Sequence, residues 1–274
     1  INMDKNIVVH GDYDADGVCS AAILVNCLKK LGAKKVGVFL PHREIDGYGL
    51  NNNTINYLKN NGTDLIITCD CGVSNFGEVT LAKELGMQVI ITDHHVVPEK
   101  IPPADAIIHH LIPGETYPDK GLAGCGVAFK LAQGLLHEHK KNHNGLPDGQ
   151  TQESYEKWQL DLVALATIGD MVPLFGESRT LVRYGLTVLN KTKNIGIKKL
   201  LQVAGVVDET GKHKRGAFDT HTVGFQLVPR LNAAGRMDHA NSAFALLTTD
   251  DEMEAEKLAQ QLNKNNTDRQ KITE

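Results

Sequence analysis

The sequence predicts an α/β protein with a parallel five-stranded sheet flanked by helices, followed by a mostly helical portion. Short runs rich in Val and Ile recur through the first 112 residues, and each has the length of a buried strand. These runs lie at residues 7–9, 36–40, 65–68, 89–91 and 106–108. Helical stretches separate them, and strand–helix–strand alternation at this spacing is typical of right-handed βαβ units. After Pro113 the pattern becomes mainly helical.

The predicted helices are bounded by glycine and by polar, turn-forming segments. A helix over 20–31 ends at Gly32, and the last helix before the fourth strand ends at Gly86. The expected helices lie at 20–31, 53–60, 78–85, 126–139, 153–166, 178–189 and 197–203. The polar stretch 137–149 predicts an exposed insertion. Its three histidines could bind metal, although a solvated loop is the favoured interpretation.

The last 26 residues predict one further helix. Residues 249–252, Thr-Asp-Asp-Glu, have the pattern of a capping box. We expect the helix to carry its apolar side chains on one side, at Met253, Leu258, Ala259 and Leu262. It becomes polar toward Glu274, which is typical of a helix whose partner lies beyond this chain. The sequence thus divides into an α/β part (1–112), a helical part (113–248) and the start of a long helix (249–274).

Composition excludes several classes of protein. Of the 274 residues, 41% are hydrophobic, which excludes wholesale disorder, and no apolar run approaches the roughly 18 residues of a membrane span. The start lacks the pattern of a signal peptide, so we expect a cytoplasmic protein. A net charge of -4 argues against coating nucleic acid by bulk charge but allows a local basic groove. Five cysteines do not form a disulfide framework, and we expect free thiols.

Four polar clusters follow predicted strands or interrupt an apolar helical run. They are His10–Gly17 (HGDYDADG), Asp70–Gly72, Asp93–His95 and Gly169–Asp170. Ligands of an open parallel sheet bind beyond the carboxyl ends of its strands. Because three of the clusters follow such strands, we expect them to converge on one crevice.

The residue types in these clusters indicate a site for divalent cations. Carboxylates gathered in one crevice repel each other unless cations compensate them, and the set comprises Asp12, Asp14, Asp16, Asp70, Asp93 and Asp170. Carboxylate with imidazole and without thiolate suits Mn²⁺ or Mg²⁺ better than structural zinc. Two ions sharing a carboxylate would activate water and stabilise charge on a phosphoryl group. A lone Asp of this kind is commonly a helix cap or part of a turn, but four coincident clusters favour the metal site.

The assembled pattern resembles the DHH phosphoesterase superfamily, whose name-giving triplet stands here as Asp93-His94-His95. Within it, the chain is most similar to the RecJ family of bacterial single-strand-specific 5′→3′ exonucleases. The similar stretches are HGDYDADG (10–17), PHREIDGYGL (41–50), CDCGVSN (69–75), TDHH (92–95), LAGCGVAFKL (122–131), LATIGDMVPL (165–174) and GFQLVPRLNAAGRMDHA (224–240). They follow in order through nearly the whole chain.

The resemblance implies two divalent cations, with Mn²⁺ preferred and Mg²⁺ as the alternative. The implied metal ligands are His10, Asp14, Asp16, Asp70, His94 and Asp170. Asp70 would bridge the ions, with His10 and Asp14 completing one site and the other three ligands completing the second. The resemblance also places His95 against the scissile phosphate and makes Asp93 the residue that orients a neighbouring histidine. Asp12 is ambiguous between supporting ligands and handling water.

Further residues of the similar stretches are candidates for binding substrate. The guanidinium groups of Arg230 and Arg236 would grip phosphates bidentately, and Asn232 lies between them. Arg43 and Tyr48 would hold a strand near the site, with Tyr48 stacking on a base. The alternatives are a surface arginine and a packed tyrosine. Gly124 and Gly126 predict a tight turn into a helix, where an anion site is a secondary interpretation.

The implied function is a two-metal phosphodiesterase with Asp70, His95, Asp12 and Arg230 as catalytic residues. It would release 5′-mononucleotides from single-stranded DNA in repair and recombination. We expect a monomer, with a single-strand-binding protein and a helicase as candidate partners. One alternative is a relative that cuts short oligonucleotides, cyclic dinucleotides or pyrophosphate. The other is a non-catalytic replication scaffold, which the intact ligand set disfavours.

The chain also departs from the family pattern. His109-His110 stands where Asn-Pro is usual, Asp46 stands where Glu is commoner, and the insertion at 137–154 is unusually long. We expect His109 and His110 to perturb the rim of the site. The family's second domain, with its Gly-Gly-His signature, and its oligonucleotide-binding fold have no counterpart here. The sequence therefore predicts a catalytic-core fragment, with a DHH domain at 1–248 and the start of a linker helix at 249–274.

Overall fold

The fold is built on a sheet of five parallel strands, as predicted. The computed structural model describes residues 4–214 and 216–273. The strand order is β2-β1-β3-β4-β5. The strands are β1 (Ile7–His10), β2 (Val36–Phe39), β3 (Leu65–Cys69), β4 (Gln88–Thr92) and β5 (Ala106–Ile108). Strand β1 pairs with β2 on one side and with β3 on the other. The strand order therefore reverses direction between β1 and β3, which is a topological switch point.

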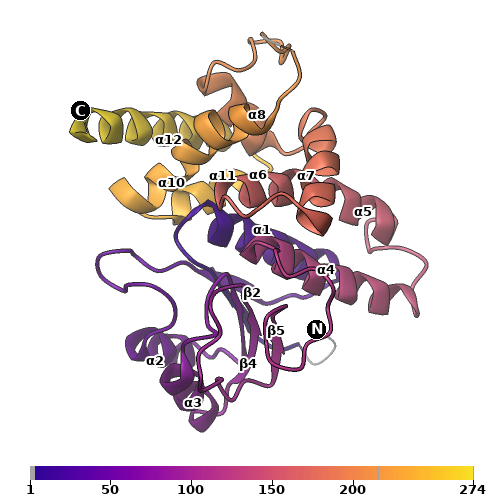
Figure 1. Ribbon diagram of the computed structural model, residues 1–274, viewed down its shortest axis with the longest axis vertical. Helices are drawn as coiled ribbons and strands as arrows, with labels where there is room; N and C mark the ends of the chain where they lie inside the picture. Colours follow the sequence, from indigo (N-terminus) through magenta and orange to yellow (C-terminus); the bar gives the residue numbers. More distant parts are fainter. Residues whose placement is uncertain (1–3, 215, 274) are drawn as a thin grey trace.

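Helices cover both faces of this sheet (Figure 1). On one face lie α2 (Asn52–Asn60) and α3 (Phe76–Glu84), and on the other α1 (Ala15–Lys30) and α4 (Gly124–Lys140). Alternate strand residues point to opposite faces. Val8 and Ile66 accordingly join the apolar cluster under α2 and α3, whereas Val9 and Ile67 join the larger cluster on the other face. Both faces of the sheet are covered by apolar side chains, which explains the continuous Val and Ile runs of the strands.

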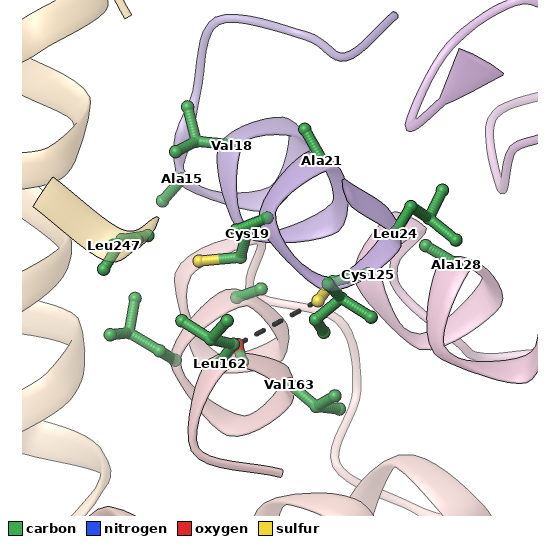
Figure 2. Close-up of a cluster of buried hydrophobic side chains, with 14 of the residues drawn as sticks. Ala15, Val18, Cys19, Ala21, Leu24, Cys125, Ala128, Leu162, Val163 and Leu247 are labelled. Carbon is green, nitrogen blue, oxygen red and sulfur yellow. Dashed lines mark hydrogen bonds between the residues drawn. The ribbon is translucent and has the colours of Figure 1, made fainter. Parts of the chain in front are cut away.

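Helix α1 connects the sheet to the helical part. It is buried along most of its length and packs against α4, α6 (Leu160–Gly169) and α11 (Asn241–Thr248). A helix that is apolar on all sides lies inside a protein, between other elements. Small side chains allow the close approach, and Figure 2 shows Cys19 and Ala21 of α1 in this layer with Leu162 of α6. All five cysteines are free and buried, as expected.

The helical part contains more breaks than the sequence predicts. Its remaining elements are α5 (Gln152–Trp158), α7 (Gly176–Leu189), α8 (Ile195–Val203), α9 (Thr220–Thr222), the π-helical turn η1 (Val223–Leu227), α10 (Val228–Met237) and α12 (Glu252–Thr273). The prediction of one helix over 153–166 is wrong, because α5 and α6 separate at Gln159. Just after the break, the amide of Leu162 donates to the carboxylate of Asp161 at 2.7 Å. Gln159, which precedes α6, makes no side-chain cap hydrogen bond.

The insertion and the last helix also differ in detail from the prediction. Helix α4 continues to Lys140, and Leu146 is buried, so the segment 137–149 is not wholly exposed. The prediction of a capping box at 249–252 is wrong. Asp251 caps the helix instead, and its carboxylate accepts the amides of Met253 (2.8 Å) and Glu254 (3.0 Å). Met253 is 83% exposed and lies outside the buried side of α12, which is formed by Ala255, Ala259 and Leu262.

Helix α12 finds its packing partners within the chain. It packs against α8, α10 and α11, so its apolar side is covered within this chain. That the helix leads to a partner beyond this chain stays a prediction. Figure 1 shows α12 beside α8 and α10, on the side of the helical part remote from the sheet. No helix among the described residues is both long enough and apolar enough to cross a membrane.

Candidate metal centre and phosphate-binding rim

The first polar cluster forms a tight turn between β1 and α1. Asp14 caps α1, and its carboxylate accepts the amides of Asp16 (2.9 Å) and Gly17 (3.0 Å). A Cβ at Gly17 would lie 2.5–2.6 Å from the main chain of Asp12, so only glycine permits this close turn. The cap and the metal-ligand interpretations of Asp14 are compatible, since a carboxylate offers about four lone-pair directions.

His10 ends β1 with its ring fully buried. The ring stacks on Phe39 with 5.3 Å between centroids, and Nδ1 lies 3.7 Å from the sulfur of Cys71. Burial lowers the pKa of His10 to about 4, so the imidazole is neutral at neutral pH. Its Nε2 is buried and has no hydrogen-bond partner among the described residues. A neutral imidazole with a free nitrogen is the form that binds a metal ion.

Asp16 is bound by the N-terminus of α4. The amides of Gly124 (2.7 Å) and Cys125 (2.8 Å) donate to its two carboxylate oxygens. The anion at this helix N-terminus is therefore the chain's own carboxylate, which the sequence did not reveal. Burial, followed by the charges of Asp170 and Asp14, raises the pKa of Asp16 well above its ordinary value. In the sequence, only the glycines of LAGCGVAFKL indicated that the start of α4 comes close to another segment.

Asp70 follows β3 in a strained backbone conformation. Its φ of 61° lies in the left-handed region, which is unusual for a residue other than glycine and is common at functional sites. Its Oδ1 is buried without a hydrogen-bond partner among the described residues and lies 3.2 Å from Nε2 of His94. Burial and then the charges of Asp16 and Asp14 raise the pKa of Asp70 well above its ordinary value. A cation would remove this penalty.

Asp93 orients the triplet that follows β4. Its carboxylate accepts the amides of Val73 (2.9 Å), His94 (2.7 Å) and His95 (3.1 Å), and Nδ1 of His95 lies at 2.8 Å. Burial opposes ionisation, but the hydrogen bonds from His95 and Val73 lower the pKa of Asp93 overall. The same contact raises the pKa of His95, whose side chain is 43% exposed. Asp93 thus holds the main chain of both histidines and the ring of His95.

His94 lies at the centre of the carboxylates. Its Nε2 lies 3.2 Å from Asp70, 3.8 Å from Asp170 and 3.9 Å from Asp16. Possible ligand atoms approach within 4.8 Å of one another in three sets: Asp16–His94–Asp170, Asp12–Asp14–Asp70 and Asp70–His94–His95. The structure therefore gathers most of the predicted ligands. His10 is not in these sets, and Asp12 accompanies Asp14 and Asp70 in its place.

Two predicted substrate-binding residues lie on the loop after β2. The hydroxyl of Tyr48 donates to the main-chain oxygen of Asp70 at 3.1 Å and lies 3.0 Å from Nδ1 of His95. Tyr48 therefore braces two site residues, in addition to any role in stacking. The guanidinium of Arg43 lies over the ring of Tyr13 at 5.1 Å. Arg43 is thus held above the turn of the first cluster by a cation–π contact.

Helix α10 connects the helical part to the same turn. The side-chain oxygen of Asn232 accepts the amide of Ala15 at 2.7 Å, and a Cβ at Gly235 would lie 2.4 Å from the oxygen of Tyr13. Arg236 is exposed on this helix. Arg230 instead donates to Asn263 of α12 (2.9 Å) and to the main-chain oxygen of Gln226 (2.5 Å). Its guanidinium is therefore engaged with helical neighbours in this conformation.

The parallel α/β fold and the carboxylate–histidine crevice together define a protein with a candidate site for divalent metal. Residues 6–167 match the model of the DHH family, N-terminal domain, and the chain belongs to that family. The curated relatives include the single-stranded-DNA-specific exonuclease RecJ of Bacillus subtilis, 43% identical over 272 residues, covering 99% of this chain and 32% of the relative. RecJ of Escherichia coli is 38% identical, covering 97% of this chain and 45% of the relative.

Solved structures agree with this assignment. A crystal structure of exonuclease RecJ bound to manganese superposes with a TM-score of 0.83 at 36% identity, covering 99% of this chain and 64% of that one. RecJ from Thermus thermophilus in complex with Mn²⁺ gives a TM-score of 0.79 at 35% identity, covering 99% of this chain and 36% of that one. The predicted resemblance is confirmed. The chain spans about a third to a half of the curated relatives' length.

Proposed function

We propose that this chain is the DHH catalytic part of a RecJ-type exonuclease, which degrades single-stranded DNA from the 5′ end and releases 5′-mononucleotides. The observation that carries the proposal is a crevice of buried ligand atoms that make no hydrogen bond to any described residue. Among the described residues, these atoms are His10 Nε2, Asp12 Oδ1, Asp70 Oδ1 and His94 Nε2. Buried polar atoms are nearly always satisfied, so four of them on neighbouring segments indicate bound cations. The relatives named as single-stranded-DNA-specific exonucleases supply the substrate class.

The donor set fits two Mn²⁺ or Mg²⁺ ions. It combines carboxylate oxygen with neutral imidazole and contains no thiolate. RecJ structures named with manganese and with magnesium support this choice of metals. We propose His10, Asp14, Asp16, Asp70, His94 and Asp170 as the ligands, with Asp70 shared. Asp12 lies close enough to Asp14 and Asp70 to act as a further ligand.

The chain's own residues would bind and orient the substrate. Divalent ions at this site would supply an activated water and neutralise charge on the phosphate. Nδ1 of His95 lies 2.8 Å from Asp93 and its Nε2 lies 3.4 Å from the hydroxyl of Tyr48, so in the charged form Nε2 would donate to the scissile phosphate. The raised pKa of His95 favours the charged form that binds phosphate. Arg43 and Arg236 would contact adjacent phosphates of the strand, and Arg230 would do so after releasing Asn263.

Substitution of the shared carboxylate tests this proposal. Asp70→Asn should abolish Mn²⁺-dependent release of mononucleotides from a 5′-phosphorylated, end-labelled single strand, because an amide is a poor ligand and carries no charge. The matched control is Asp250→Asn, since Asp250 is exposed and remote in sequence from the four clusters. A folded Asp70→Asn variant with near wild-type activity would refute the assignment.

The same assay separates the alternatives. Faster turnover of dinucleotides or pyrophosphate than of long single strands would favour another phosphodiesterase of this superfamily. Absence of Mn²⁺ binding in calorimetric titration would favour a scaffold without catalysis. The cytoplasmic location, the monomeric state and the candidate partner proteins stay predictions.

A further inference from the structure

His109 follows β5 and contacts the triplet segment from outside. Only 3% of the residue is exposed, and its Nε2 lies 2.8 Å from the main-chain oxygen of His95. The amide of Leu111 donates to Nδ1 of the same ring at 3.1 Å. Because Nδ1 accepts this bond, the ring proton lies on Nε2, and Nε2–H donates to the oxygen of His95. Two main-chain groups therefore fix both the tautomer and the orientation of the imidazole.

This contact lies where the regular strand pairing ends. The ladder between β4 and β5 stops at Thr92 and Ile108, and one further main-chain bond joins the amide of Asp93 to the oxygen of Ile108 at 3.3 Å. The next residues of the chain, His94 and His95, leave the sheet. Beyond the last strand pair, the side chain of His109 bonds the main-chain oxygen of His95, which no strand among the described residues bonds.

We propose that His109 is a positioning residue for the metal centre. By holding the oxygen of His95 it restrains the main chain of the triplet, and so keeps Nε2 of His94 directed at Asp70 and Asp16. Asp93 restrains the same segment from its other side through the amides of His94 and His95. The two contacts clamp the segment between β4 and β5. The consequence for metal binding rests on the proposed function, whereas the clamp itself does not.

Two matched substitutions separate the donor from the bulk of the ring. In His109→Gln the side-chain amide nitrogen occupies the place of Nε2 and can donate to His95. In His109→Leu the side chain has similar bulk but no polar atom, so the oxygen of His95 loses its donor. Residues that orient metal ligands typically change metal affinity by roughly 10–100-fold when removed. His109 acts one bond further away, so we expect the lower end of that range.

Calorimetric titration with Mn²⁺ measures the effect on the metal centre. We expect about 10-fold weaker binding for His109→Leu and binding within about 3-fold of wild type for His109→Gln. Equal affinity of His109→Leu and wild type would overturn the inference. Equally weak binding by both variants would overturn it too, because the donor would then not matter. Far-ultraviolet circular dichroism on each sample confirms that the variants are folded.

Nuclear magnetic resonance of the metal-free chain tests the clamp independently of any metal. The wild type should show His109 in the Nε2-protonated tautomer. His109→Leu should shift the amide resonances of His94, His95 and Val96 more than His109→Gln does. An Nδ1-protonated tautomer, or equal shifts in the two variants, would overturn the inference. A wild-type chain that binds no Mn²⁺ overturns the proposed function, and the resonance result then decides on His109 alone.

Discussion

Replacing Gly124 by alanine should impair the metal centre although no proposed ligand is substituted. A Cβ at Gly124 would lie 2.3 Å from Oδ1 of Asp70 and 2.7 Å from its Cβ and Cγ. Rotation of the Asp70 side chain cannot relieve this clash, because its Cβ is itself too close. Either the main chain of Asp70 or the start of α4 must therefore move. Moving α4 would stretch the bonds of 2.7 Å and 2.8 Å that hold Asp16.

The size of the effect follows from these distances. Ordinary contact begins at 3.4 Å, so the Asp70 oxygen must move by about 1 Å. Misplacement by about 1 Å can reduce catalysis by roughly 100-fold. We therefore expect kcat/KM for mononucleotide release to fall by about 100-fold, or about 2.7 kcal/mol in transition-state stabilisation.

The matched control lies in the same helix. A Cβ at Gly134 of α4 would meet nothing within 4 Å, so Gly134→Ala should keep wild-type activity. It should also stabilise the fold by up to about 1 kcal/mol through helix propensity. Both variants are assayed on the same labelled single strand and titrated with Mn²⁺. Activity and Mn²⁺ affinity of Gly124→Ala within about 3-fold of the Gly134→Ala values would refute the reasoning.

Three further predictions concern stability, thiols and metal. Burial raises the pKa of Asp161 from 3.8 to about 6. As pH rises from about 4 to about 7, the unfolding free energy of the wild type should therefore fall by up to about 3 kcal/mol relative to that of Asp161→Asn. Urea unfolding at each pH measures this difference. All five thiols are buried, and burial raises their pKa values, so an aromatic disulfide reagent should react with none in the native chain and with five after unfolding. Mn²⁺ at about 100 times its Kd should raise the unfolding free energy by about 2.7 kcal/mol and Tm by about 5–10 °C.

The sign of the Asp161 effect follows from its two protonation equilibria. The folded state holds the proton up to a higher pH than the unfolded state, so between about pH 4 and pH 6 rising pH favours unfolding. A difference between wild type and Asp161→Asn that does not change with pH would contradict this. Rapid reaction of any native thiol would contradict the predicted burial. Equal Mn²⁺ stabilisation of Asp70→Asn and wild type would contradict the ligand assignment.

The sheet was predictable because each strand has a recognisable local sequence pattern. A strand buried on both faces needs a short continuous apolar run, and all five runs proved to be strands. Helix ends were less predictable. Residues 153–166 form an unbroken pattern, yet α5 and α6 are separated at Gln159, although its φ of -72° and ψ of -12° stay in the right-handed helical region. The cap of α12 is Asp251 and not the predicted Thr249. Both Asp and Thr are favoured N-cap residues, so the sequence pattern alone does not distinguish them.

The candidate site was predictable in its residues but not in their contacts. The carboxylates and histidines follow strands, and parallel strands end at one edge of the sheet. That Asn232 would bind the amide of Ala15, 217 residues earlier, depends on how α10 packs against α1. Likewise, Arg230 and its partner Asn263 lie on different helices, and no local pattern pairs them.

The sequence alone determined which chemistry this protein carries, because residue types at strand ends follow from local pattern and strand ends are near each other in any parallel sheet. Only the tertiary structure decided which atoms remain free for ligands. Packing α4 against the first turn gives both Asp16 oxygens an amide donor, whereas Asp70 Oδ1 and His94 Nε2 receive none from the described residues. Hydrogen bonds between distant segments are short-ranged and directional, so they depend on how the elements pack, which local sequence does not encode.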